Sequence, residues 1–438
     1  MWPVSRTIDR YDTTFDHDGL ISNAGLIVTA TLMMRLGVEQ LTTRWVRTGA
    51  PNAGRKICTL IAAMLAGATH IEHANIVRAG ATQAVLPFRV MAPSTIGTFL
   101  RTFTFGFVRQ LDAVASRLLA RAWELGAGPG NAPLVIDLDS TICEVHGHAK
   151  HGAAYGYTRQ LGYHPLIAAR SDTAEIVFSR MRKGSAGSSR GVVRFVDELV
   201  AIVRRAGATG PVTMRADSGF WSWKLIDTLN RHRIAWSITV TSNAKIRATI
   251  DAIPDDAWQE IDYTAGGVAQ VAECVYTVGR RGSRKFRTVR LVVRRTRLTD
   301  PAQLRLWPEW RHHAFITNRN DLTAVEADQF HRHHAVVELA IRDLKAGGAE
   351  HIPSGHYAAN AAWFGCAVIA HNLTRWACLL GDQPTVTSVT FRTRITAIPA
   401  VAVNRSGRPT LRLPRQWPWA DSFTSMLTAV RALPGPAG

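Results

Sequence analysis

The sequence predicts a mixed α/β fold that follows an all-helical N-terminal region and carries a β-rich insertion. Two observations support this fold class. Apolar residues recur at spacings of three and four in segments of residues 24–125, which is the helical period. After the Gly/Pro-rich turn Gly126–Pro133, short apolar runs ending in an acid alternate with amphipathic segments. The apolar fraction of 46% is large enough for a sizeable core.

The helical region, residues 1–125, contains three strongly periodic segments. They are residues 26–46, 56–68 and 94–125, and Ser94 with Thr95 resembles a helix cap at the start of the last. A helical region of this size commonly binds DNA or mediates dimerisation, and a plain packing scaffold is an equally good interpretation.

The α/β core is expected in two pieces, residues 126–244 and 311–380. The elements of the first piece are strands at 134–141, 163–170 and 176–181, a helix at 192–207, a strand at 211–220, a helix at 223–233 and a strand at 234–241. Three strands followed by alternating helices and strands predict a mixed sheet.

The second piece begins with a strand at 312–318. A long helix at 321–348, ended by glycines, and an apolar helix at 353–380 follow. The C-terminal extension, 381–438, is expected to hold short strands at 391–401 and 409–414 and then a helix at 417–433.

The β-rich insertion, residues 245–310, reads as paired strands at 269–279 and 284–298 with a turn at Gly279–Ser283. Nine basic residues and no acidic one lie from Arg280 to Arg297. This pattern predicts a face that contacts phosphates, and Arg284, Lys285 and Arg287 are the residues we select for it. A solvated edge strand protected by charge is the alternative.

The charge balance indicates a polyanionic partner. Lys and Arg number 52 against 33 Asp and Glu, a net charge of +19, which favours nucleic acid. The five cysteines are scattered without a CxxC pair, which argues against a disulfide framework and favours a reducing cytoplasm. The N-terminus does not resemble a signal peptide, and the apolar stretches are shorter than the ~20 residues of a membrane span. We therefore expect a cytoplasmic protein without a membrane partner.

Acidic residues stand at the ends of the predicted strands. Asp137 and Asp139 are two residues apart and share one face of a strand, Asp217 ends a second strand, and Glu338 lies on the helix after a third. Such acids can meet at one sheet edge and bind divalent metals, as phosphodiester cleavage requires. Any one of them taken alone is more often a structural cap.

The residues around Glu338 carry a family resemblance. In HRHHAVVELAIRDLK, the side chains of His331, His334, Glu338 and Lys345 follow at spacings of three, four and seven. This pattern resembles the Tyr-x2-Arg-x3-Glu-x6-Lys signature of the IS4-like DDE transposases. IDLDST and RADSGF resemble the two aspartate strands of that superfamily. HGAAYGYTRQLGYHPLIA and RSGRPTLRLPRQWPW are similar to the IS1380 family in particular.

The resemblance implies an RNase H-like core interrupted by the β-rich insertion. It implies that Asp139, Asp217 and Glu338 are the catalytic metal ligands, with Mg²⁺ as the cofactor and Mn²⁺ able to substitute. Asp139 matches the family's Asp-x-Thr pattern better than Asp137. Asp137 is the alternative for the first metal ligand. Lys345 would contact a phosphate near the element's end.

The chain also departs from the family signature. His331 stands at the Tyr position and His334 at the Arg position, and a histidine lacks the guanidinium fork. We still expect His331, His334 and Arg342 to contact DNA from the helix that carries Lys345.

The expected function is metal-dependent cleavage of transposon ends and strand transfer into target DNA. The partners would be double-stranded DNA, at the terminal inverted repeats and the target, and a second copy of the chain in a dimer on DNA. The expected location is the bacterial cytoplasm, on the nucleoid when DNA is bound. No nucleotide cofactor is expected, because transesterification is isoenergetic.

Parts of the sequence also fit three other functions. A domesticated or inactive transposase could bind DNA without cutting it, and an RNase H-like nuclease would only cleave. VIDLDST also fits the first strand of haloacid-dehalogenase-type phosphatases, but a later GDxxxD pair is missing. A zinc site at His146, His148 and His151 is disfavoured because a fourth ligand is not suitably spaced.

Overall fold

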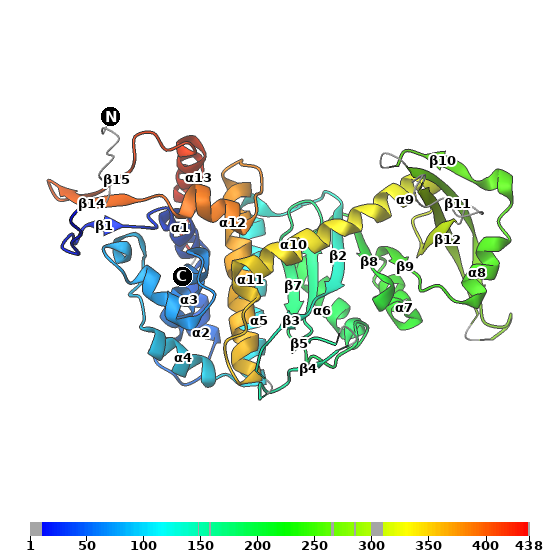
Figure 1. Cartoon of the computed structure of the whole chain (residues 1–438), viewed down its shortest axis with the longest axis horizontal. Coiled ribbons are helices and arrows are strands. Elements are labelled where there is room, and N and C mark those ends of the chain that lie inside the picture. Colours follow the sequence, from blue (N-terminus) through cyan, green and yellow to red (C-terminus); the bar gives the residue numbers. More distant parts are fainter. Residues whose placement is uncertain are drawn as a thin grey trace.

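The computed structural model is an elongated molecule with helices at one end, a sheet in the middle and a long β-ribbon at the other end (Figure 1). It describes residues 11–147, 149–156, 159–263, 267–283, 286–298 and 310–436. Arg284, Lys285 and His148 therefore lie outside the described residues. No helix among the described residues is long and apolar enough to cross a membrane.

The N-terminal region is helical, as predicted. Its α-helices are α1 (Leu26–Leu36), α2 (Val38–Trp45), α3 (Ala53–Leu65), α4 (Pro93–Arg101) and α5 (Phe105–Ala122). Short 3₁₀ helices at Ile71–Val77 and Thr82–Val85 join α3 to α4. Gly37, with φ 71°, ends α1 and starts α2, a left-handed conformation that glycine adopts without strain.

The prediction of a single helix over 94–125 was wrong in two respects. The segment forms α4 and α5, separated by a break at residues 102–104. The cap prediction was also wrong, because α4 already begins at Pro93, a residue whose fixed φ suits the first helical position. Beyond α5 the chain continues as a π-helical turn, Trp123–Ala127.

The core of the molecule is a nine-stranded mixed sheet. In spatial order its strands are β10 (Gln259–Ile261), β11 (Gly267–Val278), β12 (Arg287–Leu298), β13 (Arg311–Thr317), β9 (Ala235–Thr239), β8 (Val212–Ala216), β2 (Leu134–Ser140), β6 (Leu166–Arg170) and β7 (Ile176–Arg180). A small separate sheet comprises β3 (Cys143–Glu144), β5 (Leu161–Tyr163) and β4 (Ala154–Tyr155).

The pairing of the sheet changes from antiparallel to parallel at β2, the third strand from the β7 edge. On one side β6 and then β7 pair antiparallel, and on the other side β8 and then β9 pair parallel. The parallel connections contain α6 (Val192–Arg205) and α7 (Trp223–Arg231). These elements match the predicted strands and helices in type and order.

The predicted insertion extends this sheet. After α8 (Ala244–Asp251), β11 and β12 form the expected antiparallel pair, and β13 joins β12 to β9. Because β12 lies between β11 and β13, the edge-strand interpretation of its charge is wrong.

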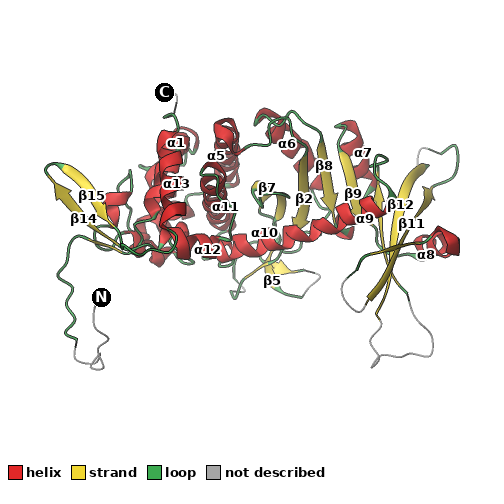
Figure 2. Ribbon diagram, turned by 90° about the horizontal axis from the view of Figure 1, so that it is seen from above, coloured by secondary structure: helices red, strands yellow, loops and turns green. Residues whose placement is uncertain are grey.

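The long helix predicted over 321–348 forms with an interruption. It consists of α9 (Ala324–Arg332), a 3₁₀ turn (His333–Ala335), α10 (Val336–Leu344) and a π-helical turn (Lys345–Ala349). Figure 2 shows α9 and α10 end to end along the sheet.

The C-terminal segments return to the N-terminal helices. The predicted strand at 391–401 is wrong in its first half, where α12 (Ser388–Phe391) and a π-helical turn (Arg392–Thr396) form. A hairpin follows, β14 (Ala400–Arg405) and β15 (Arg408–Arg412), and β14 also pairs with β1 (Leu20–Ile21). The final helix α13 (Ala420–Ala432) packs on α1.

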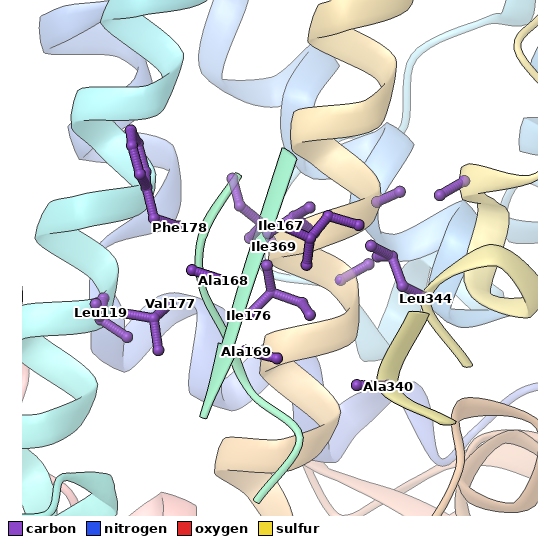
Figure 3. Close-up of a cluster of buried hydrophobic side chains, with 14 of the residues drawn as sticks. Leu119, Ile167, Ala168, Ala169, Ile176, Val177, Phe178, Ala340, Leu344 and Ile369 are labelled. Carbon is purple, nitrogen blue, oxygen red and sulfur yellow. The ribbon is translucent and has the colours of Figure 1, made fainter. Parts of the chain in front are cut away.

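The helical end and the sheet share one hydrophobic core. Helix α11 (Tyr357–Leu380) lies against α3, α5 and β7 and is buried over most of its length. Figure 3 shows where the two halves meet, with strand and helix side chains interleaved. The labelled side chains include Ile167, Val177 and Phe178 from the sheet and Leu119, Ile369 and Leu344 from helices.

Candidate active site

Asp139 and Asp217 stand side by side at one edge of the sheet. Strands β2 and β8 are parallel and in register through the pair Leu138 and Ala216, and each aspartate is the next residue of its strand. Neighbouring strands lie ~4.8 Å apart, so the two side chains leave the sheet at the same level. Asp139 is half-buried and Asp217 is exposed.

Glu338 reaches the same region from α10, which packs on β2 and β6. It lies in the first turn of that helix and is exposed. Burial, together with the nearby charges of Asp217 and Glu338, raises the pKa of Asp139 to about 6. The Ser140 N–H and His334 lower this pKa. The structure therefore brings the three predicted acids into one electrostatic environment.

Each aspartate is held by backbone donors. The Ser140 N–H donates to Asp139 Oδ1 at 2.6 Å, and the Gly219 N–H donates to Asp217 Oδ1 at 3.0 Å, where Asp217 caps a 3₁₀ turn. Burial raises the pKa of Asp217, whereas His334 and the backbone donors lower it.

The loop KGSAGSSRG, residues 183–191, borders this edge. Ser188 Oγ lies 3.1 Å from Ser140 Oγ, next to Asp139. The guanidinium of Arg182 donates to the carbonyls of Gly187, Ser188 and Arg190, which ties the loop down. No signal in the sequence pointed to this role of Arg182, because its contacts form only in the folded chain.

Asp137, the reserve choice, has a structural partner. It is 1% exposed, and both of its carboxylate oxygens accept from Arg215, at 2.7 and 2.8 Å. The ring of His334 also contacts it, with Nδ1 2.9 Å from Oδ1. Sequence reasoning missed Arg215, although its position two residues before Asp217 placed it opposite Asp137 in the parallel pair.

The two histidines predicted to contact DNA differ in their exposure. His331 is buried, with Nδ1 on Ser237 Oγ at 2.7 Å and Nε2 on Thr239 Oγ1 at 2.9 Å, so it cannot reach DNA as it lies. That expectation is corrected, because both ring nitrogens stabilise the packing of α9 on the sheet. His334 is half-buried against Asp137.

Lys345 and Arg342 lie on the helix as expected. The half-buried Lys345 donates its Nζ to the carbonyl of Ile142 at 2.8 Å, which places its ammonium just beyond the end of β2. Arg342 is exposed on α10.

The basic side chains of β12 are largely neutralised. Arg287 pairs with Asp227, Arg290 with Glu273 and Arg294 with Asp328. A strand with nine basic residues in and around it therefore presents less free charge than its sequence suggests. Of the three predicted contacts on this ribbon, Arg287 is the one that the structure describes.

The three acids are the right kind of ligand for a divalent cation, but they do not lie close enough together to hold one in this structure. Carboxylate oxygens are the ligands that Mg²⁺ and Mn²⁺ prefer. None of the three acids forms an ion pair with Lys or Arg in the described part of the chain, in contrast to Asp137. However, no group of three or more His, Cys, Asp or Glu side chains among these residues is close enough to hold a metal ion.

Comparisons with known proteins identify a family. A family model described as "Transposase DDE domain group 1" matches residues 8–435. No curated protein sequence matches. A solved structure described as "Cryo-EM structure of piggyBac transposase synaptic complex with hairpin DNA (SNHP)" has 11% identity and a TM-score of 0.44, covering 86% of this chain and 80% of that chain. This structural similarity is too low to carry a statement about function.

Proposed function

Because the chain belongs to the DDE transposase domain family, we propose that it cuts the ends of a transposable element and joins them to target DNA. The observation that carries the proposal is that Asp139 and Asp217 follow paired residues of adjacent parallel strands, with Glu338 near enough for its charge to act on Asp139. These are uncompensated carboxylates in a chain with a net charge of +19. Structural ion-pair networks do not account for them, whereas Asp137 is explained by Arg215.

DDE transposase domains generally use divalent metals, and we propose Mg²⁺ here, with Mn²⁺ able to substitute. Asp139, Asp217 and Glu338 would be the ligands, with Asp139 and Asp217 already oriented by backbone N–H groups. Bound divalent ions would supply Lewis-acid activation of the attacking and leaving oxygens. Metal binding would have to bring the three carboxylates closer together than they lie in this structure.

The remaining site residues would position DNA. The ammonium of Lys345 lies beside the end of β2 and donates one hydrogen bond to the Ile142 carbonyl, so its other N–H groups could donate to a phosphate. His334 is anchored through Nδ1 on Asp137, which leaves Nε2 for a phosphate oxygen. Arg342 and Arg287 stay in the proposal as outer contacts, as do Arg284 and Lys285 outside the described residues.

The finer assignments also belong to the proposal. The strand pairing around β2 supports an RNase H-like core, because β6 and β7 form antiparallel pairs on one side of it and β8 and β9 form parallel pairs on the other. Four statements remain predictions from the sequence: membership of the IS1380 family, the division into five regions, a dimer on DNA and a cytoplasmic location.

The test is cleavage of a DNA that carries the flanking element ends, in the presence of Mg²⁺. Wild type is run beside Asp139→Asn, Asp217→Asn and Glu338→Gln, with Asp255→Asn, an exposed acid outside the site, as the matched control. We expect the three site variants to bind DNA and to lose cleavage by about 10³-fold or more, because carboxylate ligands are removed. The control should cut like wild type.

A second readout separates metal binding from activity. Mn²⁺ titrated into each protein should bind to wild type and to Asp255→Asn and should bind weakly to the site variants. Wild type that binds the ends and never cuts would replace the proposal with the domesticated or inactive reading. Cleavage retained in Asp139→Asn and lost in a folded Asp137→Asn would move the first ligand to Asp137.

A further inference from the structure

The C-terminal hairpin lies within a long arginine-rich stretch that has no acidic residue. Between Asp382 and Asp421 the chain has six arginines and no acidic residue. The hairpin β14–β15 projects from the helical end, far from the sheet edge where β2 and α10 meet (Figures 1 and 2). A local concentration of positive charge on a projecting element is a surface for a polyanion.

The hairpin is a defined ribbon with two different faces. Its two-residue turn, Ser406 and Gly407, has φ of 50° and 78°, as in turns that match the twist of paired strands. On β15, Leu411 packs against the core, and so does Leu413 just beyond the strand. Because side chains alternate along a strand, Arg408, Thr410 and Arg412 point the opposite way, and all three are exposed.

The arginines on this face, and Arg415 just beyond the strand, lack an acidic partner among the described residues. No ion pair is recorded for Arg408, Arg412 or the exposed Arg415 within the residues that the structure describes. This contrasts with β12, where Arg290 and Arg294 are paired with acids. The hairpin charge is therefore available to a ligand without first breaking an internal contact.

The base of the ribbon is anchored. Trp417 Nε1 donates to the carbonyl of Arg394 at 2.8 Å, and the Arg394 guanidinium lies over the Trp419 ring at 5.5 Å. β14 is also paired with β1 from the other end of the chain. A fixed ribbon loses little conformational entropy on binding, unlike a flexible basic tail.

We propose that the β14–β15 hairpin is a second DNA-binding element, which contacts the phosphates of duplex DNA away from the cleavage site. Arg408 and Arg412 are four strand residues apart, about 13 Å, close to the ~12 Å width of the B-DNA major groove. That groove admits a two-stranded ribbon, whereas the major groove of duplex RNA is too narrow. The proposal rests on the proposed function, because it takes DNA as the partner.

The experiment measures binding to a short random-sequence DNA duplex over a range of salt concentrations. Random sequence suffices because phosphate contacts are independent of sequence. The triple variant Arg408→Gln, Arg412→Gln, Arg415→Gln should bind about tenfold or more weakly than wild type, and the slope of log K against log salt should fall by ~0.9 per lost phosphate contact.

A matched control removes the same charge elsewhere. Arg205→Gln, Arg233→Gln and Arg247→Gln change three exposed arginines without a recorded ion pair on or next to α6, α7 and α8. This triple variant should stay close to wild type. Circular dichroism and thermal unfolding of both variants check that they fold.

Each contrary result overturns a specific statement. Equal weakening in the two triple variants would show that only the overall charge matters and would overturn the hairpin proposal. Wild-type affinity and salt slope in the hairpin variant would overturn it as well. An equal loss of binding to duplex RNA would overturn the assignment to DNA. A wild-type protein that fails to bind any duplex would overturn the proposed function itself, a result distinct from the others.

Discussion

At the scale of single residues, the two aspartates of β2 have opposite environments although they share a strand face. Asp137 is 1% exposed and neutralised by Arg215, whereas Asp139 at the strand end has no basic partner within the described residues. Position along the strand accounts for the difference, since an acid inside the sheet needs a partner and an acid at its edge can face solvent or a ligand. Asp137 is therefore best explained as structural.

This assignment predicts the behaviour of the pair under mutation. Arg215→Met should lower the free energy of unfolding by about 3–5 kcal/mol, because it leaves the buried Asp137 carboxylate uncompensated. The double variant Asp137→Leu, Arg215→Met should recover most of that loss, since no buried charge remains. Urea unfolding of wild type, both single variants and the double variant measures the coupling. Additive losses would contradict a direct pairing.

At the scale of elements, the path from α9 to α10 decides where Glu338 lies. The N-terminus of α9 is fixed by a capping box, in which Thr323 Oγ1 accepts from the Glu326 N–H and Glu326 Oε2 accepts from the Thr323 N–H. Buried His331 then holds the helix on β9 through Ser237 and Thr239. These local contacts orient the following helix, which carries Glu338 and ends where Lys345 begins.

The cap is expected to contribute measurably to stability. Thr323→Ala should lower the free energy of unfolding by about 1 kcal/mol, because the Glu326 N–H loses its acceptor at the end of the helix. Thr323→Ser keeps the hydroxyl and should stay within a few tenths of a kcal/mol of wild type. Urea unfolding of the three proteins measures the difference, and equal losses in Ala and Ser variants would argue against the cap.

At the scale of the whole molecule, Glu175 joins the helical end to the sheet. It follows β6 at the turn into β7 and is fully buried. Its carboxylate accepts from the indole Nε1 of Trp123 at 3.0 Å and from that of Trp376 on α11, and Arg170 lies 3.8 Å away. Burial raises the pKa of Glu175 to about 7, although these neighbours lower it.

This buried carboxyl predicts a pH dependence of stability. Because its pKa is raised from 4.5 to about 7 on folding, the native state binds more protons than the unfolded state between these values. The free energy of unfolding should therefore fall as the pH rises from about 4.5 to about 7, by at most ~3 kcal/mol from this group. Glu175→Gln, which keeps an acceptor for the indoles, should lose that part of the slope. Urea unfolding at several pH values compares the two proteins, and parallel profiles would contradict the assignment.

Much of the fold was predictable because local patterns and tertiary packing agree in it. The strands β2, β8 and β9 and the helices α6 and α7 match their predicted segments. The predictions failed where a local pattern was ambiguous. Pro93 moved the start of a helix, and residues 391–396, read as part of a strand, form helical turns whose Phe391 and Ile395 pack in the core. The sequence also could not show that β13 would merge the insertion with the main sheet.

By itself, the sequence determined the acids at strand ends, the helical spacing from Glu338 to Lys345 and the excess of positive charge, because these are properties of composition and local periodicity. Only the tertiary structure decided which of these groups are free. It paired Asp137 with Arg215, buried His331, paired Arg290 and Arg294 of β12 with acids, and left Arg408 and Arg412 of the β14–β15 hairpin exposed. The physical reason is that the availability of a charged group depends on its burial and on partners distant in the sequence, and the folded chain alone brings those partners together.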